Sequence, residues 1–150
     1  MQNDPYSDIL SLVSTRTDLN KINNELDLLE AGIFEMKGNT FDFVLKNSIS
    51  EGLANVIAKL VSGQNKEEII KKIKERLAQI KFVEITIAID PSQEFIEKMV
   101  SMIKENINQN VALDIKIDRS ILGGARVIFE GKYHDGSLKN KLDKILVNYA

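Results

Sequence analysis

The chain has 150 residues, of which 43% are hydrophobic and 28% charged, and its formal net charge is −2. These values are typical of one globular domain, or of a small domain with an extension, and they exclude wholesale disorder and a positive field that would hold nucleic acid or an anionic membrane. Because cysteine is absent, disulfides, thiolate nucleophiles and cysteine-ligated metals are excluded. Residues 1–5 are polar, so we expect no secretory signal, and no apolar run reaches the roughly 20 residues that a membrane span needs.

Residues 1–80 have the apolar spacing of helices and predict a helical region of about three to four helices. From Leu19 to Met36, apolar residues recur at alternating spacings of three and four, which makes an a/d seam of about two and a half heptads. Gly38 is placed to end this helix. The seam leaves two interpretations open: the helix covers its own domain, or it docks on a helix of a partner protein.

Two further helices are predicted before the apolar pattern changes. One runs from Thr40 to Val61 with a continuous apolar stripe, and it is ended by residues 62–64, which read SGQ. The next begins at Asn65, whose side chain can cap a helix, and continues to Ile80. Its charged outer face carries both signs and is interpreted as a solvated surface.

The apolar pattern changes near Lys81 from helical spacing to the period-two alternation of strands. In residues 83–89, the apolar side chains alternate with Glu84, Thr86 and Ala88, as in a strand with one buried face. The same alternation predicts further strands at residues 111–117, 125–130 and 132–134.

Helices separate and close these strands. Residues 90–93, DPSQ, combine a capping aspartate, a proline at the first helical position and a glutamine suited to a capping box, and they predict a helix that reaches Ile107. A closing helix is predicted after Ser137. The order β-α-β-β-β-α predicts a parallel pair joined by a crossover helix, with an antiparallel hairpin beside it. The predicted fold class is therefore α+β, with a helical region at residues 1–80 and a small α/β domain at residues 81–150.

Glycines in the second half raise the question of a phosphate-binding loop. Gly123 and Gly124 match neither the phosphate-loop nor the dinucleotide-binding spacing, and they lead into a strand rather than a helix. Gly136 precedes a helix, but Asp135 beside it would repel an anion and is better suited to capping. We therefore interpret these glycines as backbone devices, with Gly131 turning a hairpin, and we expect no cofactor.

Residues 118–125, DRSILGGA, resemble the D-P-x-L-I-G-G signature of the F-type ATP synthase delta subunit, called OSCP in mitochondria. The resemblance covers about residues 81–146, with Arg119 in place of the proline of the family. The helical region is shorter than the N-terminal helical bundle of the family, and its heptad stripe also resembles the b subunits of the stalk. The structural motif positions marked by the resemblance are Asp118, Gly123, Gly124, Gly131, Asp135, Gly136 and Ser137.

The resemblance implies a function in the peripheral stalk, or stator, of a rotary ATP synthase. Such a subunit joins the catalytic F1 head, through its alpha subunits, to the b-subunit helices, and it resists the torque of the rotor. The resemblance further implies a non-catalytic chain that is held at the cytoplasmic face of the energy-transducing membrane by the complex. It implies no cofactor, no nucleic acid and no homo-oligomer.

A search for reactive groups agrees with a protein-binding role. His134 is the only histidine, which excludes a multi-histidine metal site. Neither Ser120 nor Ser137 has a histidine at the spacing of a known triad motif. Arg126 and Lys116, if side by side on the outer face of the sheet, could receive an acidic partner or could simply make that face polar. An enzyme is therefore not expected.

Apolar residues outside the expected core are the candidate partner contacts. Ile128 is predicted on the opposite face of the sheet from Val127 and Phe129. An apolar side chain is unexpected on that face if the face only contacts solvent. The closing helix carries further apolar side chains. We expect this part of the chain to bind the C-terminal ends of the b helices through Ile128, Leu138, Leu142, Leu146 and Tyr149.

Two other functions remain open. The chain could be an E-like peripheral-stalk subunit of a V/A-type ATPase, which a longer N-terminal helix without breaks at Gly38 and Gly63 would favour. It could also be a free-standing regulatory α/β module, which a saturable small-molecule ligand and the lack of any ATP synthase partner would reveal.

Overall fold

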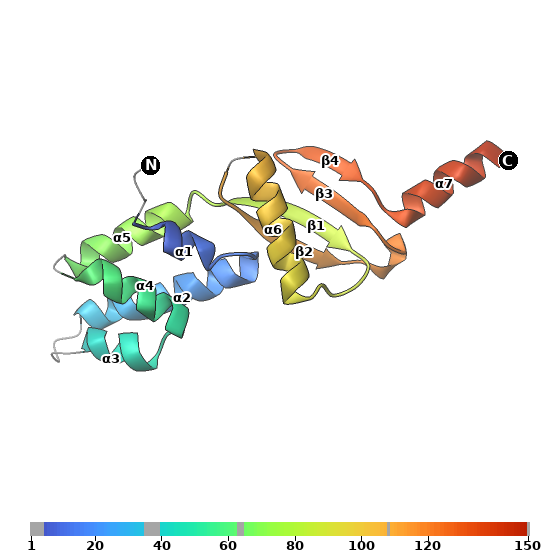
Figure 1. Ribbon diagram of the computed structural model, residues 1–150. Coiled ribbons are helices and arrows are strands. Elements are labelled where there is room, and N and C mark those ends of the chain that lie inside the picture. Colours follow the sequence, from blue (N-terminus) through green and yellow to red (C-terminus); the bar gives the residue numbers. More distant parts are fainter. Residues whose placement is uncertain (1–4, 35–39, 63–64, 108, 150) are drawn as a thin grey trace. The chain divides into compact units, whose positions relative to one another are not determined.

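The computed structural model of the chain describes residues 5–34, 40–62, 65–107 and 109–149, with the backbone alone at residues 107, 145, 146, 148 and 149 (Figure 1). The chain divides into two compact units. We call residues 1–13 and 17–80 the helical unit, and residues 14–16 and 81–150 the sheet unit. The chain therefore passes from one unit to the other after residues 13, 16 and 80.

The helical unit packs its helices around an apolar core. The predicted seam lies in this core, because Leu19, Ile22, Leu26 and Leu29 are all buried. Met36 and Gly38, which were predicted to end the seam and its helix, lie outside the described residues. Most of the seam is therefore covered by its own unit. The described helices are α1 (Ser7–Ser11), α2 (Arg16–Phe34), α3 (Thr40–Asn47), α4 (Glu51–Val61) and α5 (Lys66–Leu77).

The prediction of one helix from Thr40 to Val61 is wrong, because the chain breaks between α3 and α4. Ser50 has the extended backbone of an N-cap, with φ −66° and ψ 144°, and its hydroxyl donates to Glu25 Oε2 at 2.7 Å. Both Phe41 and Leu53 remain buried on either side of the break. The apolar stripe thus continues through the break, which is why periodicity alone did not show it.

The start of α5 confirms the predicted cap, since the Asn65 side chain accepts a hydrogen bond from Glu67 N at 3.1 Å. Further along this helix, Lys74 Nζ lies 2.7 Å from Asp27 Oδ1 and 2.5 Å from Glu30 Oε2 on α2. These two hydrogen bonds raise the pKa of Lys74. The ion pairs join α5 to α2 at the rim of the core.

The sheet unit has the predicted α+β fold. The strand order is β2-β1-β3-β4, with β1 parallel to β2 and antiparallel to β3, and with β3 and β4 forming a hairpin. This topology confirms the predicted parallel pair and antiparallel hairpin. The elements are β1 (Lys81–Ile87), α6 (Gln93–Ile107), β2 (Val111–Ile117), the 3₁₀ turn η1 (Arg119–Ile121), β3 (Ala125–Phe129), β4 (Lys132–Asp135) and α7 (Leu138–Tyr149).

Helix α6 covers one face of this sheet, as Figure 1 shows. Val100 of the helix is buried against strand residues that include Val83 and Ile85. The inward residues of β3 complete this layer, with Val127 and Phe129 packed at its margin. In β1 the alternation that predicted the strand marks the face that the helix covers, whereas β2 departs from it, because Ala112 is buried and Ile117 is 42% exposed.

The outer edge of β2 is covered by the short segment that precedes α2. Thr15 forms a parallel β-bridge with Leu113, and Leu113 N donates to Ser14 O at 2.9 Å. The side chain of Arg16 then reaches Asp114, with Nε 2.9 Å from Oδ2. An edge strand that would otherwise be open is thus paired by residues distant in the sequence.

Candidate partner-binding surfaces

The paired glycines bring two segments of backbone into direct contact. Gly124 has φ +71°, and a Cβ on this residue would lie only 2.4 Å from the carbonyl oxygen of Gly136. Gly136 N donates to Ala125 O, and Leu138 N donates to Gly123 O, both at 2.9 Å. We call residues 122–125 and 136–138 the glycine junction. At Gly124 the lack of a side chain is required by this close approach as well as by φ.

Two aspartates cap the turns on either side of the junction. Asp118 Oδ1 accepts from Ser120 N at 2.9 Å, and Asp135 Oδ1 accepts from Ser137 N at 2.9 Å. Ser137, which is fully buried, caps α7 by accepting from Asn140 N at 3.2 Å. Aspartate and serine thus share the capping of the closing helix.

Arg126 lies between the two aspartates. Its Nη1 is 3.5 Å from Asp118 Oδ2, and its Nε donates to Asp135 Oδ2 at 3.2 Å. Hydrogen bonds from Ser137 are the main cause that lowers the pKa of Asp135 to about 2, and hydrogen bonds from Ser120 lower the pKa of Asp118. Both carboxylates are therefore ionised at neutral pH. The sequence did not single out Arg126 for this role.

The β3–β4 hairpin turns at Gly131, where φ is +76°, after Glu130 at φ +47°. Positive φ at two central residues is the geometry of the two-residue hairpin turns that match strand twist. Among the described residues other than Gly131 and its two chain neighbours, no heavy atom lies within 4 Å of a Cβ built on Gly131. The glycine at this turn is thus favoured by backbone conformation, without the crowding found at Gly124.

The face of the sheet opposite α6 carries the candidate Ile128. This residue pairs with Tyr133 across the hairpin and with Glu84 on β1. Directly opposed residues share a face of the sheet. Ile128 is 38% exposed and Tyr133 is 60% exposed. The two form an apolar pair that is open to a partner.

The expectation that Arg126 and Lys116 lie side by side is wrong. Both are register partners of Thr86, so strand β1 separates them. Lys116 Nζ donates to Glu84 Oε2 at 2.7 Å, and Arg126 is held by the capping aspartates. Each cation is already paired within the sheet unit and is not free for an acidic partner.

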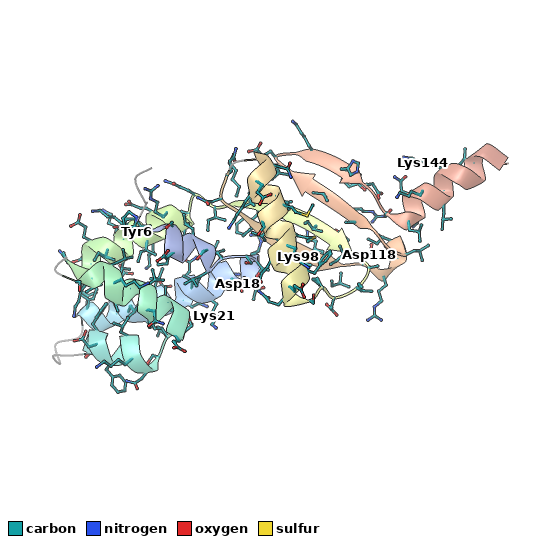
Figure 2. All side chains as sticks on the ribbon, viewed as in Figure 1. Tyr6, Asp18, Lys21, Lys98, Asp118 and Lys144 are labelled. Atoms are coloured by element: carbon teal, nitrogen blue, oxygen red, sulfur yellow. The ribbon has the colours of Figure 1, made fainter. Side chains whose placement is uncertain are left out.

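Helix α7 carries candidates on one face. Leu138 and Leu142, four residues apart, are 45% and 41% exposed. The candidate side chains of Leu146 and Tyr149 lie outside the described ones. The helix also bears Lys139, Lys141 and Lys144, the last labelled in Figure 2, against the single acidic residue Asp143. Apolar and basic groups thus occur together on α7.

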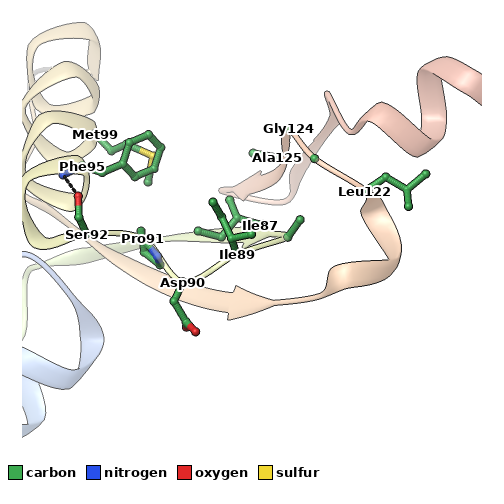
Figure 3. Close-up of a pocket in the computed structure, with 12 residues that line it drawn as sticks. Ile87, Ile89, Asp90, Pro91, Ser92, Phe95, Met99, Leu122, Gly124 and Ala125 are labelled. Carbon is green, nitrogen blue, oxygen red and sulfur yellow. Dashed lines mark hydrogen bonds between the residues drawn. The ribbon is translucent and has the colours of Figure 1, made fainter.

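An apolar cleft of about 630 Å³ lies where the carboxyl end of β1 meets the first turns of α6 and the loop before β3 (Figure 3). Ile89, Phe95 and Leu122 line it and are 75%, 46% and 59% exposed. The alternation in residues 83–89 placed Ile89 on the buried face of a strand, and this prediction is wrong. Strand β1 ends at Ile87, whose carbonyl accepts from Asp118 N at 2.9 Å, before the chain turns.

Reactive groups do not gather in the part of the chain that the structure describes. His134 is exposed on β4, where it pairs in register with Val127. Within the described ranges there is no cluster of three or more acidic or histidine side chains able to hold a metal, and none of their helices is both long and apolar enough to cross a bilayer. The features that stand out are the glycine junction and the exposed apolar surfaces around it.

Comparison with known proteins identifies the family. The model of the ATP synthase delta (OSCP) subunit family matches residues 34–147. The chain belongs to this family. The match includes the glycine junction and all of the sheet unit except its ends, and it extends into the helical unit as far as the end of α2. The OSCP match therefore reaches beyond the part of the sequence in which the motif was found.

Curated relatives carry the same family name. The ATP synthase delta subunit of Mesoplasma florum is 31% identical over 106 residues, which cover 65% of this chain and 57% of that protein. The delta subunit of Mycoplasma capricolum is 31% identical over 100 residues, covering 62% and 55%. The chain thus spans about half the length of these relatives. Among solved structures, a chain of the Toxoplasma gondii mitochondrial ATP synthase hexamer has a TM-score of 0.41 and 14% sequence identity to this chain. The superposition covers 89% of this chain and 84% of that one, and the likeness is too weak to support an argument.

Proposed function

We propose that this OSCP-family chain is a peripheral-stalk subunit that links the F1 head to the b-subunit helices and resists rotor torque, without catalysing a reaction itself. The observation that carries the proposal is the family match over residues 34–147. It places the chain among subunits of an ATP synthase. The partners and the mechanical role within that complex are the part proposed here, together with peripheral attachment to the cytoplasmic face of the membrane.

The internal bracing of the sheet unit supports a load-bearing role. A body that transmits torque must resist local opening, which depends on the density of its buried contacts and hydrogen bonds. The glycine junction adds two backbone hydrogen bonds beyond Arg126 and Asp135, the last pair of the β3–β4 hairpin, and the Arg126 side chain ties Asp118 to Asp135. Thr15 pairs with Leu113 at the outer edge of β2. These contacts join the ends of the sheet unit to its centre.

The exposed apolar groups of the sheet unit supply the surface for the b helices. Four large side chains of this unit are exposed to solvent in the isolated chain: Ile128 and Tyr133 on the sheet, and Leu138 and Leu142 on α7. Full burial of an exposed side chain of this size contributes roughly 1.5–3 kcal/mol, and these partly exposed side chains would contribute less, as part of a larger interface. We assign the b-subunit contact to this unit.

The helical unit is proposed to contact the alpha subunits of the F1 head. Its own core uses the seam of α2, so the groups left for a partner are on the outside. Leu28, Phe34 and Phe43 are 50%, 65% and 64% exposed. Exposed aromatic side chains of this kind are enriched at protein interfaces.

Affinity purification in mild detergent from cells that make the chain tests the proposal. Alpha, beta and b chains should co-purify with the tagged protein. An Ile128→Asp variant should lose b while its fold, judged by circular dichroism, stays intact. Recovery of the wild-type protein without any ATP synthase chain would overturn the stalk role, and full retention of b by the variant would remove the sheet face from the interface.

One observation favours the small-molecule alternative, namely the apolar cleft, whose volume of about 630 Å³ is in the range of ligand pockets. A free-standing regulatory module would bind a ligand saturably and would recover no ATP synthase chain in the same purification. The E-like alternative would be favoured by a helix without breaks at Gly38 and Gly63, and both glycines lie outside the described residues. Helix α4 ends at Val61, where the following Ser62 has ψ 98°, so no observation on the described residues favours this alternative.

A further inference from the structure

We propose that the segment Ser14–Arg16 is a releasable strap, and that its pairing with β2 couples the stability of the helical unit to that of the sheet unit. The strap is held by contacts within the sheet unit, although the residues on either side of it, Val13 and Thr17, belong to the helical unit. It lies ahead of residue 34, where the family match begins. Its action depends on this chain alone and not on any partner.

Backbone pairing attaches the strap to the edge of the sheet. Thr15 forms a parallel bridge with Leu113, and Leu113 N donates to Ser14 O at 2.9 Å. Leu113 is fully buried in the core of the sheet unit, so the strap is bound to a well-anchored position of β2. A single bridge at an edge can nevertheless open locally while the rest of the sheet stays paired. The backbone contact is thus specific but releasable.

The side chain of Arg16 attaches the strap a second time, on the face of the sheet opposite α6. Asp114 and Phe82 are on this face because they alternate with the core residues Leu113 and Val83. Arg16 Nε lies 2.9 Å from Asp114 Oδ2, and the guanidinium carbon lies 3.8 Å from the centre of the Phe82 ring. The Asp114 side chain is only 22% exposed, so this ion pair is partly shielded from solvent. Arginine here pairs with a carboxylate and stacks on an aromatic ring at the same time.

The strap turns most of the helical unit into a closed loop. Residues 17–80 follow the strap and end where Lys81 begins β1, and Lys81 N donates to Asn110 O at 3.1 Å. If the helical unit opens while the strap is paired, both ends of this segment stay fixed on the sheet, and the open chain has fewer conformations. Cross-links that close a loop stabilise a fold through this loss of unfolded-state entropy. The strap is a noncovalent cross-link of this kind, and its benefit is limited by its own strength.

Buried residues close to the strap connect it to the core of the helical unit. Val13, which directly precedes Ser14, and Leu19, in the first turns of α2, are both buried. While the strap is paired, the sheet unit holds the chain in place beside these two positions. When the strap is released, the connection between α1 and α2 gains conformational freedom, which favours opening of both helices. Release should therefore be detected in helices that the strap itself does not contain.

Native-state amide exchange of the full-length chain tests the coupling with a substitution confined to the sheet unit. Asp114→Ala removes the carboxylate that binds Arg16 and alters no residue of the helical unit. It also removes a like charge beside Glu84, its register partner on β1, so the sheet itself should not be weakened. The protection of buried amides in α2 and α4 should fall about threefold or more, as expected for the loss of one partly shielded ion pair. Protection of α2 and α4 equal to that of the wild type would overturn the inference.

The matched control is Lys116→Ala, which breaks another ion pair of β2, with Glu84, that does not include the strap. It should leave the protection of α2 and α4 unchanged, and a loss as large as that of Asp114→Ala would overturn the inference. A double-mutant cycle adds Arg16→Ala. The double variant should lose no more protection than Arg16→Ala alone, because both substitutions remove the same contact. Losses that add would mean that Asp114 acts on the helical unit by another route, and the strap would be excluded.

A second variant, Phe82→Leu, keeps the test valid if Asp114→Ala does not fold. It removes the ring beneath Arg16 and keeps an apolar side chain, and it should also lower the protection of α2 and α4. Amides of Val83 and Ile85 in the core of β1 should retain wild-type protection in both variants. A loss that is equal in β1, α2 and α4 would show that the chain opens as one body, which would overturn a strap that can be released by itself.

Discussion

Substitution of Gly124 by alanine tests the claim that the glycine junction depends on backbone contact. A φ of +71° is left-handed, which costs an L side chain about 1–2 kcal/mol. The new Cβ would lie 2.4 Å from Gly136 O, so the backbone of that residue must move, at a cost typical of overpacking, about 1–3 kcal/mol. The lower entropy of the unfolded chain returns about 0.4–1 kcal/mol. We expect Gly124→Ala to lower the free energy of unfolding of the sheet unit by roughly 3 kcal/mol.

The matched control is Gly131→Ala. This glycine has nearly the same φ, +76°, but its Cβ would meet no atom within 4 Å. The conformational term and the entropy term therefore remain without the collision, and the expected loss is about 1 kcal/mol or less. Urea unfolding followed by far-ultraviolet circular dichroism measures both variants, and amide exchange of β3 and α7 reports on the sheet unit alone. Equal losses for the two variants, within about 0.5 kcal/mol, would refute the reasoning.

Three further predictions concern other parts of the chain. Because the pKa of Asp135 is about 2 in the fold and 3.8 ordinarily, its carboxylate stabilises the fold above about pH 4 and loses this effect as the pH falls toward 2. The Asp135→Asn variant should therefore show a weaker dependence of stability on pH between about pH 4 and 2 in thermal melts. A slope equal to that of the wild type would contradict this prediction. Ser50→Ala removes the hydroxyl that donates to the buried carboxylate of Glu25 and should cost about 1–3 kcal/mol in urea unfolding, whereas a loss below about 0.5 kcal/mol would show that water replaces the hydroxyl. Leu26→Ala, at a fully buried position of α2, should cost about 2–5 kcal/mol, and exposed Leu28→Ala, measured in the same way, should cost far less.

Strand β1 could be predicted from the sequence because a strand covered on one face by a helix alternates between buried and partly exposed residues. Val83, Ile85 and Ile87 are buried, and the intervening residues are only partly so. The parallel pair and the hairpin followed from connection lengths, since the long segment between β1 and β2 holds a helix and the short turn at Gly131 allows only a hairpin. The placement of β3 beside β1 rather than β2 was not predicted.

Features set by contacts between distant segments could not be predicted. The break before α4 depends on a hydrogen bond from Ser50 to Glu25, and the strand alternation of residues 83–89 gave no sign that β1 ends at Ile87. Arg126 was seen as a surface cation because its two aspartate partners come together only when β3 and β4 pair. The junction partners Gly124 and Gly136 were each assigned to turns, but their mutual contact appears only in the fold.

The pairing of Thr15 with Leu113 has a consequence for how this protein can be dissected. A fragment that begins at Lys81 would contain every strand of the sheet yet lose the bridge at Leu113, which leaves one more unpaired amide group on the outer edge of β2 where another molecule could pair. Because Thr15 is synthesised long before Leu113, this bridge can form only after most of the chain has been made. Recombinant pieces intended to fold independently should carry the Ser14–Arg16 tripeptide, either fused or supplied as a peptide, to remain monomeric.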